Sequence, residues 1–234
     1  ILPCIPEDIA FVDQLCRLGV PKELAASAVA VTDTRHHKYS VIAVDWHSSN
    51  PHGVARWFEA RMRAFAQERL VKLVERRLYA SVDDVPAYEW KTPLQRSIQI
   101  LKRHRDVMFK DLPQWKPLSM VITTLAAQSY NGESGLYDAL VNIVDRMPNY
   151  INIKVPRIPN PVNPAEDFAD RWAKDPRFEQ NFRLWQAQVK TYLMKIAPLI
   201  GKISDVTGTV REKFGLSLTA DMQKELEISR PNAA

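Results

Sequence analysis

The chain has 234 residues, of which 46% are hydrophobic, and it carries a formal net charge of +5 with a pI near 9.2. These values exclude neither one large nor two small globular domains, because the apolar side chains suffice to fill a core. The mild positive charge suits an anionic small ligand, a nucleotide or a nucleic acid, but it requires none of them.

The cysteines and the apolar runs exclude several classes of protein. Cys4 and Cys16 are the only cysteines, and without metal-ligand spacing they form neither a disulfide framework nor a zinc site. We expect free thiols in a reducing cytoplasm, with Cys4 inert and buried in its apolar surroundings. No run approaches the roughly 18 apolar residues of a membrane span, and no signal-peptide pattern opens the chain.

The amino-terminal part is expected to contribute strands. Residues 1–8 have the character of a strand end, and residues 40–46 (SVIAVDW) are rich in the β-branched residues that favour strands. His36 and His37 lie in a polar loop between them and are expected at the surface, since no carboxylate stands at a metal-ligand spacing. Two strands make no stable sheet alone, and the sequence opens in an apolar run without Met, so we expect a fragment whose partner strands are absent.

The pattern becomes helical after Trp46. Residues 47–51 (HSSNP) are typical of a turn followed by a helix start, and apolar side chains then recur at helical spacing. The helix predicted from Pro51 runs into residues 70–78, and a linker rich in Asp and Pro follows at residues 81–88. The chain beyond this turn is predicted to be mostly helical.

Two consecutive helices, residues 93–109 and 117–130, are expected to form the centre of the helical part. Thr92 and Gln95 make a capping box around Pro93, which specifies the first helix start. One face of this helix is predicted to be apolar and consists of Leu94, Ile98, Leu101, Arg105 and Met108. The other side is predicted to be cationic and consists of Arg96, Lys102, Arg103 and His104. The second helix is apolar nearly all round, which predicts burial.

Two segments follow this pair. Ser134 is expected to cap a helix over residues 135–147, and its inward side chains are Leu136, Leu140, Ile143 and Met147. Repeated prolines in residues 148–164 forbid a continuous helix and favour an extended surface segment.

The carboxyl-terminal part is predicted to return to helix. Residues 163–166 are expected to start a short helix containing Phe168 and Trp172. A long helix from about Arg177 carries an apolar stripe of Phe178, Phe182, Trp185, Val189, Tyr192 and Ile196. Weaker helices are predicted over residues 203–214 and 219–228, and residues 229–234 are expected to be a flexible tail.

Lys102 and Ser119 are the residues that suggest a chemical function. The sequence has no phosphate-binding glycine loop, no Gly-Ser dipeptide and no Asp-x-Asp pair that would hold two metal ions. Ser119 lies in the first turn of the second helix, where unpaired N–H groups and the helix dipole favour an anion, and Lys102 lies on the cationic side of the first. If the two helices pack antiparallel, both side chains reach one polyphosphate. From the residues alone, a surface lysine and a helix-capping serine are the favoured alternatives.

The order of several motifs resembles the carboxyl-terminal part of the cGAS/DncV-like nucleotidyltransferases (CD-NTases), the bacterial cyclic-oligonucleotide synthases of antiphage (CBASS) signalling. The matching blocks are ILPCIPE at 1–7, WHSSNPHGVARWFEARM at 46–62, KTPLQRSIQILKRHRDVMF at 91–109, PLSMVITTLAA at 117–127 and IPNPVNPAEDFADRW at 158–172. Each block is weak alone, whereas their order is specific.

The resemblance implies an α+β, predominantly helical fold. Residues 1–50 would be a remnant of the catalytic mixed sheet, residues 51–228 a helical lobe like that of oligoadenylate synthase and cGAS, and residues 229–234 a flexible tail. The Gly-Ser motif and the metal-binding acids of the family do not occur in this sequence. No catalytic or metal-binding residue is therefore assigned within the chain.

The resemblance also implies the nucleotide-binding residues. Lys102 matches the helical-lobe lysine that contacts the donor triphosphate, and Ser119 matches the serine that contacts it from the next helix. Ser49 and Asn50 fall where the strand leaves the sheet at the nucleotide cleft, and His47 would face a base or form a turn.

The implied reaction is Mg²⁺-dependent joining of NTPs into a cyclic di- or trinucleotide. The substrates would be ATP, with GTP, UTP or CTP as further candidates, and the chain alone would be inactive. The implied partners are the upstream half of the catalytic lobe and CBASS regulatory or effector proteins in the cytoplasm. Neither a membrane nor double-stranded nucleic acid is expected as a partner.

Two other functions remain open from the sequence. One is a non-catalytic helical module that binds an oligonucleotide or a protein through the same cations. The other is a polymerase of the same superfamily that makes linear oligoadenylates.

Overall fold

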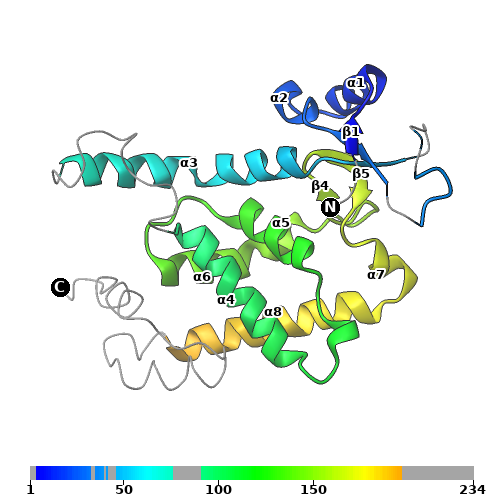
Figure 1. Cartoon of the computed structure of the whole chain (residues 1–234). Coiled ribbons are helices and arrows are strands. Elements are labelled where there is room, and N and C mark those ends of the chain that lie inside the picture. The colour runs from blue at the N-terminus through cyan, green and yellow to red at the C-terminus, as the bar shows by residue number, and fades with distance from the viewer. Residues whose placement is uncertain (1–3, 33–34, 40, 42–45, 76–90, 197–234) are drawn as a thin grey trace. The chain divides into compact units, whose positions relative to one another are not determined.

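The computed structural model describes residues 4–32, 35–39, 41, 46–75 and 91–196 and shows an α+β, predominantly helical fold, as predicted (Figure 1). The chain forms two compact units. Unit 1 comprises Ile1–Ala60 and Pro159–Asp167, and unit 2 comprises Arg61–Ile158 and the residues from Phe168 onward. The division into residues 1–50, 51–228 and 229–234 stays a prediction.

Unit 1 contains a small antiparallel sheet and two short helices. Its elements are β1 (Cys4–Pro6), α1 (Ile9–Arg17), α2 (Lys22–Ala25), β2 (Val29–Val31), β3 (His47–Ser49), the start of α3 (Pro51–Glu75), β4 (Pro159–Asn160) and β5 (Asn163–Asp167). The described strands of the sheet have the order β1-β2-β3, with Ile5 opposite Ala30 and Ala30 opposite Ser48. A core of buried Leu15, Val20, Leu24, Ala25, Ala28 and Val162 lies between α1, α2 and the β4–β5 hairpin.

Several predictions for unit 1 need correction. The sequence pattern did not predict α1, α2 and β2, whereas the expected strand at residues 1–8 is confirmed by β1. Of the strand predicted at residues 40–46, the described Val41 and Trp46 lie outside any strand, and residues 40 and 42–45 are outside the described residues. The segment predicted as a turn instead forms β3, because His47–Ser49 pair with β2. Cys4 is exposed on β1 rather than buried, and Cys4 and Cys16 are free thiols.

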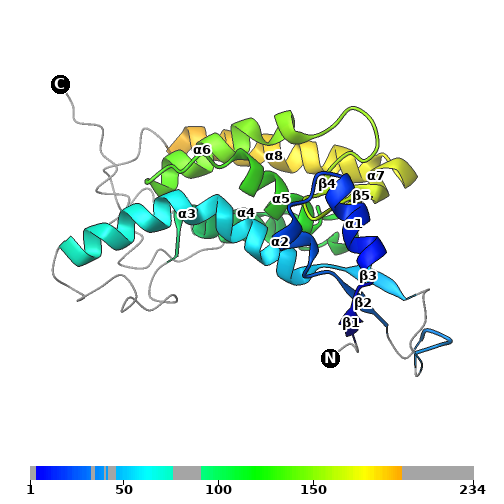
Figure 2. The same cartoon turned by 90° about the horizontal axis from the view of Figure 1, so that it is seen from above.

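Unit 2 is a helical bundle around α4 (Pro93–Met108). Its other described elements are η2 (Pro113–Trp115), α5 (Ser119–Ser129), α6 (Leu136–Arg146), η3 (Met147–Tyr150), α7 (Asp170–Lys174) and α8 (Arg177–Ile196). Helix α4 packs against α5, α6 and α8, as both views show (Figures 1 and 2). The predicted capping box is present, since the Thr92 hydroxyl accepts from Gln95 N–H and the Gln95 side chain accepts from Thr92 N–H.

The predicted packing of the helices is largely confirmed. The buried side chains of α5 include Val121, Ile122, Leu125 and Ala126, so this helix is largely buried, as predicted. On α8, the predicted stripe is buried at Phe182, Trp185, Val189 and Ile196. None of the described helices is long and apolar enough to cross a membrane. The helices predicted over residues 203–214 and 219–228, the linker at 81–88 and the tail lie outside the described residues.

Two helix starts differ from the predictions. Helix α6 begins after Gly135 without a side-chain cap, so Ser134 is not the capping residue, although Leu136, Leu140, Ile143 and Met147 are buried as predicted. Residues 163–166 form β5 instead of a helix start, because Asn163–Asp167 pair with Pro159–Asn160. The short helix α7 begins only at Asp170.

His104 was predicted on the cationic side of α4 but is buried, with a relative exposure of 1%. Its ring packs edge-on against Tyr192 of α8, with the ring centroids 5.6 Å apart. Burial lowers the pKa of His104 from 6.5 to about 4, because the charged form loses its hydration. The side chain is therefore neutral at pH 7 and adds nothing to the cationic side.

Asn50 anchors the start of α3 within unit 1. Its amide Nδ2 donates to the carbonyl of Leu24 at 2.8 Å, and its Oδ1 accepts from Gly53 N–H at 2.8 Å. The second bond is that of a helix N-cap, and a Cβ on Gly53 would lie only 2.5 Å from the Asn50 amide. Asn50 therefore joins α3 to α2, and Gly53 provides the space for it.

We expect Asn50→Ala to lower the free energy of unfolding by about 2 kcal/mol, because it removes the helix cap and the side-chain hydrogen bond to the buried Leu24 carbonyl. Urea unfolding followed by circular dichroism would measure this difference. The control is Asn149→Ala, at an exposed asparagine, which should change stability by less than about 0.5 kcal/mol. Equal stability of Asn50→Ala and wild type would contradict the anchoring role.

The burial of His104 predicts a pH dependence of stability. Since its folded-state pKa of about 4 lies below 6.5, the unfolded state binds more protons between these values, and stability falls as the pH is lowered through this range. The loss should reach about 2–3 kcal/mol below pH 4. Urea unfolding between pH 3.5 and pH 7.5 should show this loss for wild type but not for His104→Leu, with the exposed-histidine variant His52→Leu as control.

Candidate functional site

The junction between α4 and α5 brings several polar side chains together. The chain leaves α4 after Met108, passes through η2, and enters α5 at Ser119. Leu118 is the N-cap of α5 and provides no side-chain cap. Ser119 is thus the first residue of the helix, and the alternative that it serves as the cap is wrong.

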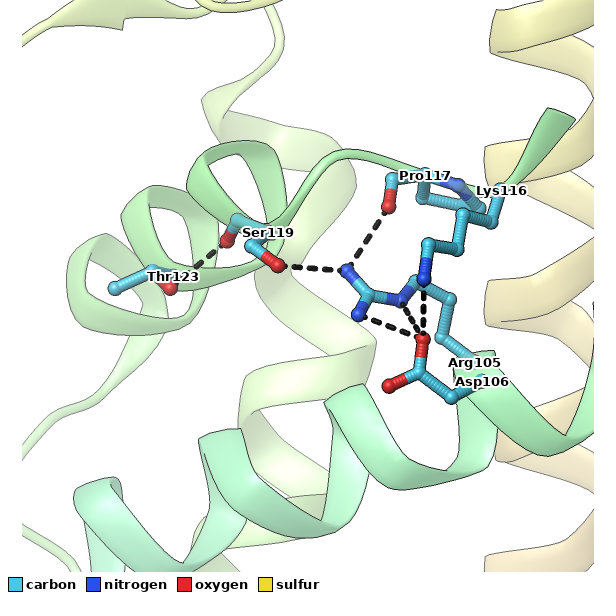
Figure 3. A network of polar contacts seen from close by, with 6 residues as sticks. All are labelled: Arg105, Asp106, Lys116, Pro117, Ser119 and Thr123. Carbon is cyan, nitrogen blue, oxygen red and sulfur yellow. Dashed lines mark hydrogen bonds and ion pairs between the residues drawn. The ribbon is translucent and has the colours of Figure 1, made fainter. Parts of the chain in front are cut away.

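The guanidinium of Arg105 is the centre of the junction (Figure 3). Its Nη1 donates to Ser119 Oγ at 2.9 Å and to the Pro117 carbonyl at 3.1 Å. Its Nε and Nη2 both donate to Asp106 Oδ1, at 3.1 and 2.8 Å. Lys116 Nζ donates to the same carboxylate oxygen at 3.0 Å. The resulting polar network, Lys116–Asp106–Arg105–Ser119, links the last turns of α4 to the first turn of α5.

The burial of the network differs from one end to the other. The Arg105 side chain is only 5% exposed, whereas those of Asp106 and Lys116 are each 40% exposed. Ser119 is an exposed residue. The guanidinium is therefore an internal support, and the solvent-accessible groups surround it.

Lys102 lies one helical turn before Arg105 on α4 and is half-buried. Burial lowers the pKa of Lys102, and the positive charge of Arg105 lowers it further, while Asp106 partly offsets both effects. The two side chains are therefore close enough for their positive charges to repel one another. An anion bound beside Lys102 would favour its charged form and relieve the repulsion.

Asp106 stays ionised within this cluster. Partial burial alone would raise the pKa of Asp106, but hydrogen bonds from Lys116 and Arg105 outweigh that effect and lower it. Lys102, Arg105 and Lys116 thus contribute three positive charges against the one carboxylate of Asp106, which leaves two in excess.

The arrangement is suited to binding an anion. Arg105 and Lys116 lie next to the amino end of α5, where the first backbone N–H groups have no partner within the helix. Phosphate groups are the biological anions that such a combination of cations, helix start and hydroxyl recognises.

The sequence pattern predicted Lys102 and Ser119 as site residues but not Arg105, Asp106 and Lys116, which the structure links to Ser119 or Lys102. Arg105 was placed on the apolar face of the helix, and it is indeed buried there. A charged residue at an apolar position needs a partner, and Asp106 follows it directly. The signal was therefore present in the sequence. Lys116 comes from the connecting segment, whose path the sequence pattern does not determine.

Ser49 and Asn50, the other predicted nucleotide-binding residues, belong to unit 1. Ser49 is the half-buried last residue of β3, and Asn50 is the buried cap of α3. Strand β3 thus ends at Ser49, where the chain was predicted to leave the sheet. The nucleotide-binding role of Ser49, Asn50, Lys102 and Ser119 stays a prediction. Within the described ranges, no three His, Cys, Asp or Glu side chains lie close enough to hold a metal ion.

Comparison with known proteins agrees with the resemblance found in the sequence. No protein-family model matches the chain. A c-di-GMP synthase of Roseivirga ehrenbergii is 34% identical over 141 residues, which cover 58% of this chain and 36% of that protein. The chain thus spans about a third of the length of this curated relative.

A solved structure shares the fold. The Bradyrhizobium diazoefficiens CD-NTase CdnG in complex with GTP superposes with a TM-score of 0.53 at 22% sequence identity, over 78% of this chain and 56% of that one. The sequence relative and the structural neighbour support the same assignment. The chain therefore resembles the cGAS/DncV-like nucleotidyltransferases both in sequence and in its α+β, predominantly helical fold.

Proposed function

We propose that this chain is part of a nucleotidyltransferase that joins NTPs into a cyclic di- or trinucleotide, and that the α4–α5 junction holds the donor triphosphate. The observation that carries the proposal is the contact of Arg105 with Ser119 at the start of α5, together with Lys102 one helical turn before Arg105 on α4. Lys102 and Ser119 stand at the two positions that the family resemblance assigns to triphosphate contacts.

The proposed reaction is attack of a ribose hydroxyl on the α-phosphate of a donor NTP. A bond forms between the hydroxyl oxygen and the α-phosphorus, the bond to the β-phosphate oxygen breaks, and pyrophosphate leaves. The junction would bind the β- and γ-phosphates, neutralise their charge and hold the α-phosphate in a fixed position. The resemblance implies Mg²⁺ as the metal, but the described residues offer no site for it, so no step is derived through it.

Guanine nucleotides are the first substrates to test. The relative from Roseivirga ehrenbergii is named a c-di-GMP synthase, and the CdnG structure contains GTP. We propose GTP as a substrate on this basis, with ATP, UTP and CTP as the alternatives. The antiphage role, the cytoplasmic location and the CBASS effector partners are proposals that rest on the resemblance alone.

The complete protein should convert NTPs into a cyclic product. It would be incubated with Mg²⁺ and each radiolabelled NTP singly and in pairs, and the products would be separated by thin-layer chromatography after phosphatase treatment. A phosphatase-resistant spot that is identified as cyclic by mass spectrometry is the expected result. Linear oligonucleotides would favour the oligoadenylate-type polymerase, and no product with any NTP would favour the binding module.

Residues 1–234 alone should make no cyclic nucleotide, because the sequence has neither the Gly-Ser motif nor the paired acids of the family. The same assay tests this expectation. Synthesis of a cyclic nucleotide by residues 1–234 would contradict this expectation and would require catalytic groups that the resemblance does not assign.

We expect Lys102→Ala in the complete protein to weaken use of the donor NTP by roughly 1.5–3 kcal/mol, the contribution of a charge-assisted hydrogen bond to a phosphate. Steady-state kinetics with the donor nucleotide varied would measure the change in kcat/KM. Lys110→Ala is the matched control, since it removes the same charge from an exposed position just after α4. Kinetics of Lys102→Ala that equal those of Lys110→Ala would mean that Lys102 is a surface lysine.

A further inference from the structure

Arg105 is a buried cation in the candidate site whose role is not explained by phosphate binding. A guanidinium has five N–H donors and no acceptor. In this structure, Arg105 uses one of them on Ser119, one on Pro117 and two on Asp106. With a side-chain exposure of only 5%, it has little surface to offer to a ligand.

These contacts determine how Ser119 can act. A serine hydroxyl has one hydrogen to donate and two lone pairs to accept with. Since Arg105 is only a donor, Ser119 Oγ must accept in the 2.9 Å contact, and its own hydrogen points elsewhere. Among the described residues Ser119 Oγ donates to no acceptor, and Ser119 is exposed. The hydroxyl is therefore held with its hydrogen available to a group from solvent.

We propose that Arg105 is a positioning residue that fixes Ser119 as a hydrogen-bond donor to the donor triphosphate. The proposal rests on the triphosphate site proposed above. It assigns to Arg105 no contact with the nucleotide: the guanidinium occupies one acceptor lone pair of Ser119 Oγ and keeps the hydroxyl hydrogen directed away from itself, where its role is to donate. A phosphate oxygen has only lone pairs, so it matches this role.

Asp106 makes this positioning possible. Its Oδ1 accepts from Nε and Nη2 of Arg105 and thereby fixes the plane of the guanidinium, so that Nη1 is aimed at Ser119 and the Pro117 carbonyl (Figure 3). The carboxylate also offsets the charge of Arg105, which favours Lys102 and Lys116 as the cations that meet an incoming anion. Lys116 is 40% exposed and shares the same oxygen.

A double-mutant cycle in the complete protein tests whether Arg105 acts through Ser119. The variants are Ser119→Ala, Arg105→Met and the two combined, and the readouts are KM for the donor NTP, kcat and the melting temperature. We expect Ser119→Ala to raise KM roughly 10-fold and Arg105→Met to raise it roughly 5-fold, with kcat little changed. The double variant should lie within about 2-fold of Ser119→Ala, since a misplaced hydroxyl no longer matters once it is removed.

The variant Arg105→Lys tests whether the hydrogen-bond geometry of the guanidinium or only its positive charge matters. A lysine ammonium is a point donor that cannot contact Asp106, Pro117 and Ser119 in the plane of a guanidinium fork. We therefore expect a KM between those of wild type and Arg105→Met. Full restoration of KM by lysine would show that charge alone suffices and would overturn the positioning role.

The controls separate the possible failures. Arg146→Met removes a different half-buried arginine of unit 2, which pairs with Glu133, and its effect should simply multiply with that of Ser119→Ala. If Arg105→Met and Ser119→Ala multiply in the same way, or if Arg105→Met lowers only the melting temperature, Arg105 is a structural residue and the triphosphate site stands. If neither Lys102→Ala nor Ser119→Ala changes KM, the proposed function fails and this inference fails with it.

Discussion

The buried guanidinium of Arg105 is the interaction on which the α4–α5 junction depends. A charge removed from water is tolerated only when nearby groups replace its hydration, and here a carboxylate, a carbonyl and a hydroxyl do so. Because the Pro117 carbonyl precedes α5, the same contacts fix the chain where it enters that helix. The contacts of Arg105 thus fix the first turn of α5 relative to α4.

The environment of α4 concentrates positive charge at one place. His104 is neutral because it is buried against Tyr192, so its neighbours on the helix act without it. Lys102 remains half-buried beside Arg105 and repels it, with only Asp106 to compensate. Such a cluster is less favourable without an anion than with one, and a bound phosphate would supply the missing negative charge. The proposed phosphate binding therefore rests on this imbalance rather than on the net charge of the chain.

The sequence predicted the elements that follow from local rules. The capping box at Thr92 gave the start of α4, and helical periodicity gave the buried stripe of α8 at Phe182 and Trp185. It failed where a partner distant in sequence decides the structure. The segment from Asn163 became a strand because it pairs with Pro159 and Asn160, and β2 formed because it lies between two other strands. Lys102 and Ser119 were singled out by their positions on the two helices, and the family resemblance then implied their contact with a triphosphate.

Arg105 shows why the candidate site itself was only half predictable. Periodicity predicted Arg105 on the inward face of α4, where it is indeed buried. An inward position by itself indicates packing and does not reveal a polar role. The partners of Arg105, namely Pro117 and Ser119, are 12 and 14 residues away, across a connection whose path no local pattern specifies. A charged side chain at an inward helical position, followed by an acid, therefore points to an internal polar contact with the next element. In this chain that element begins with the serine that the family resemblance assigns to the triphosphate.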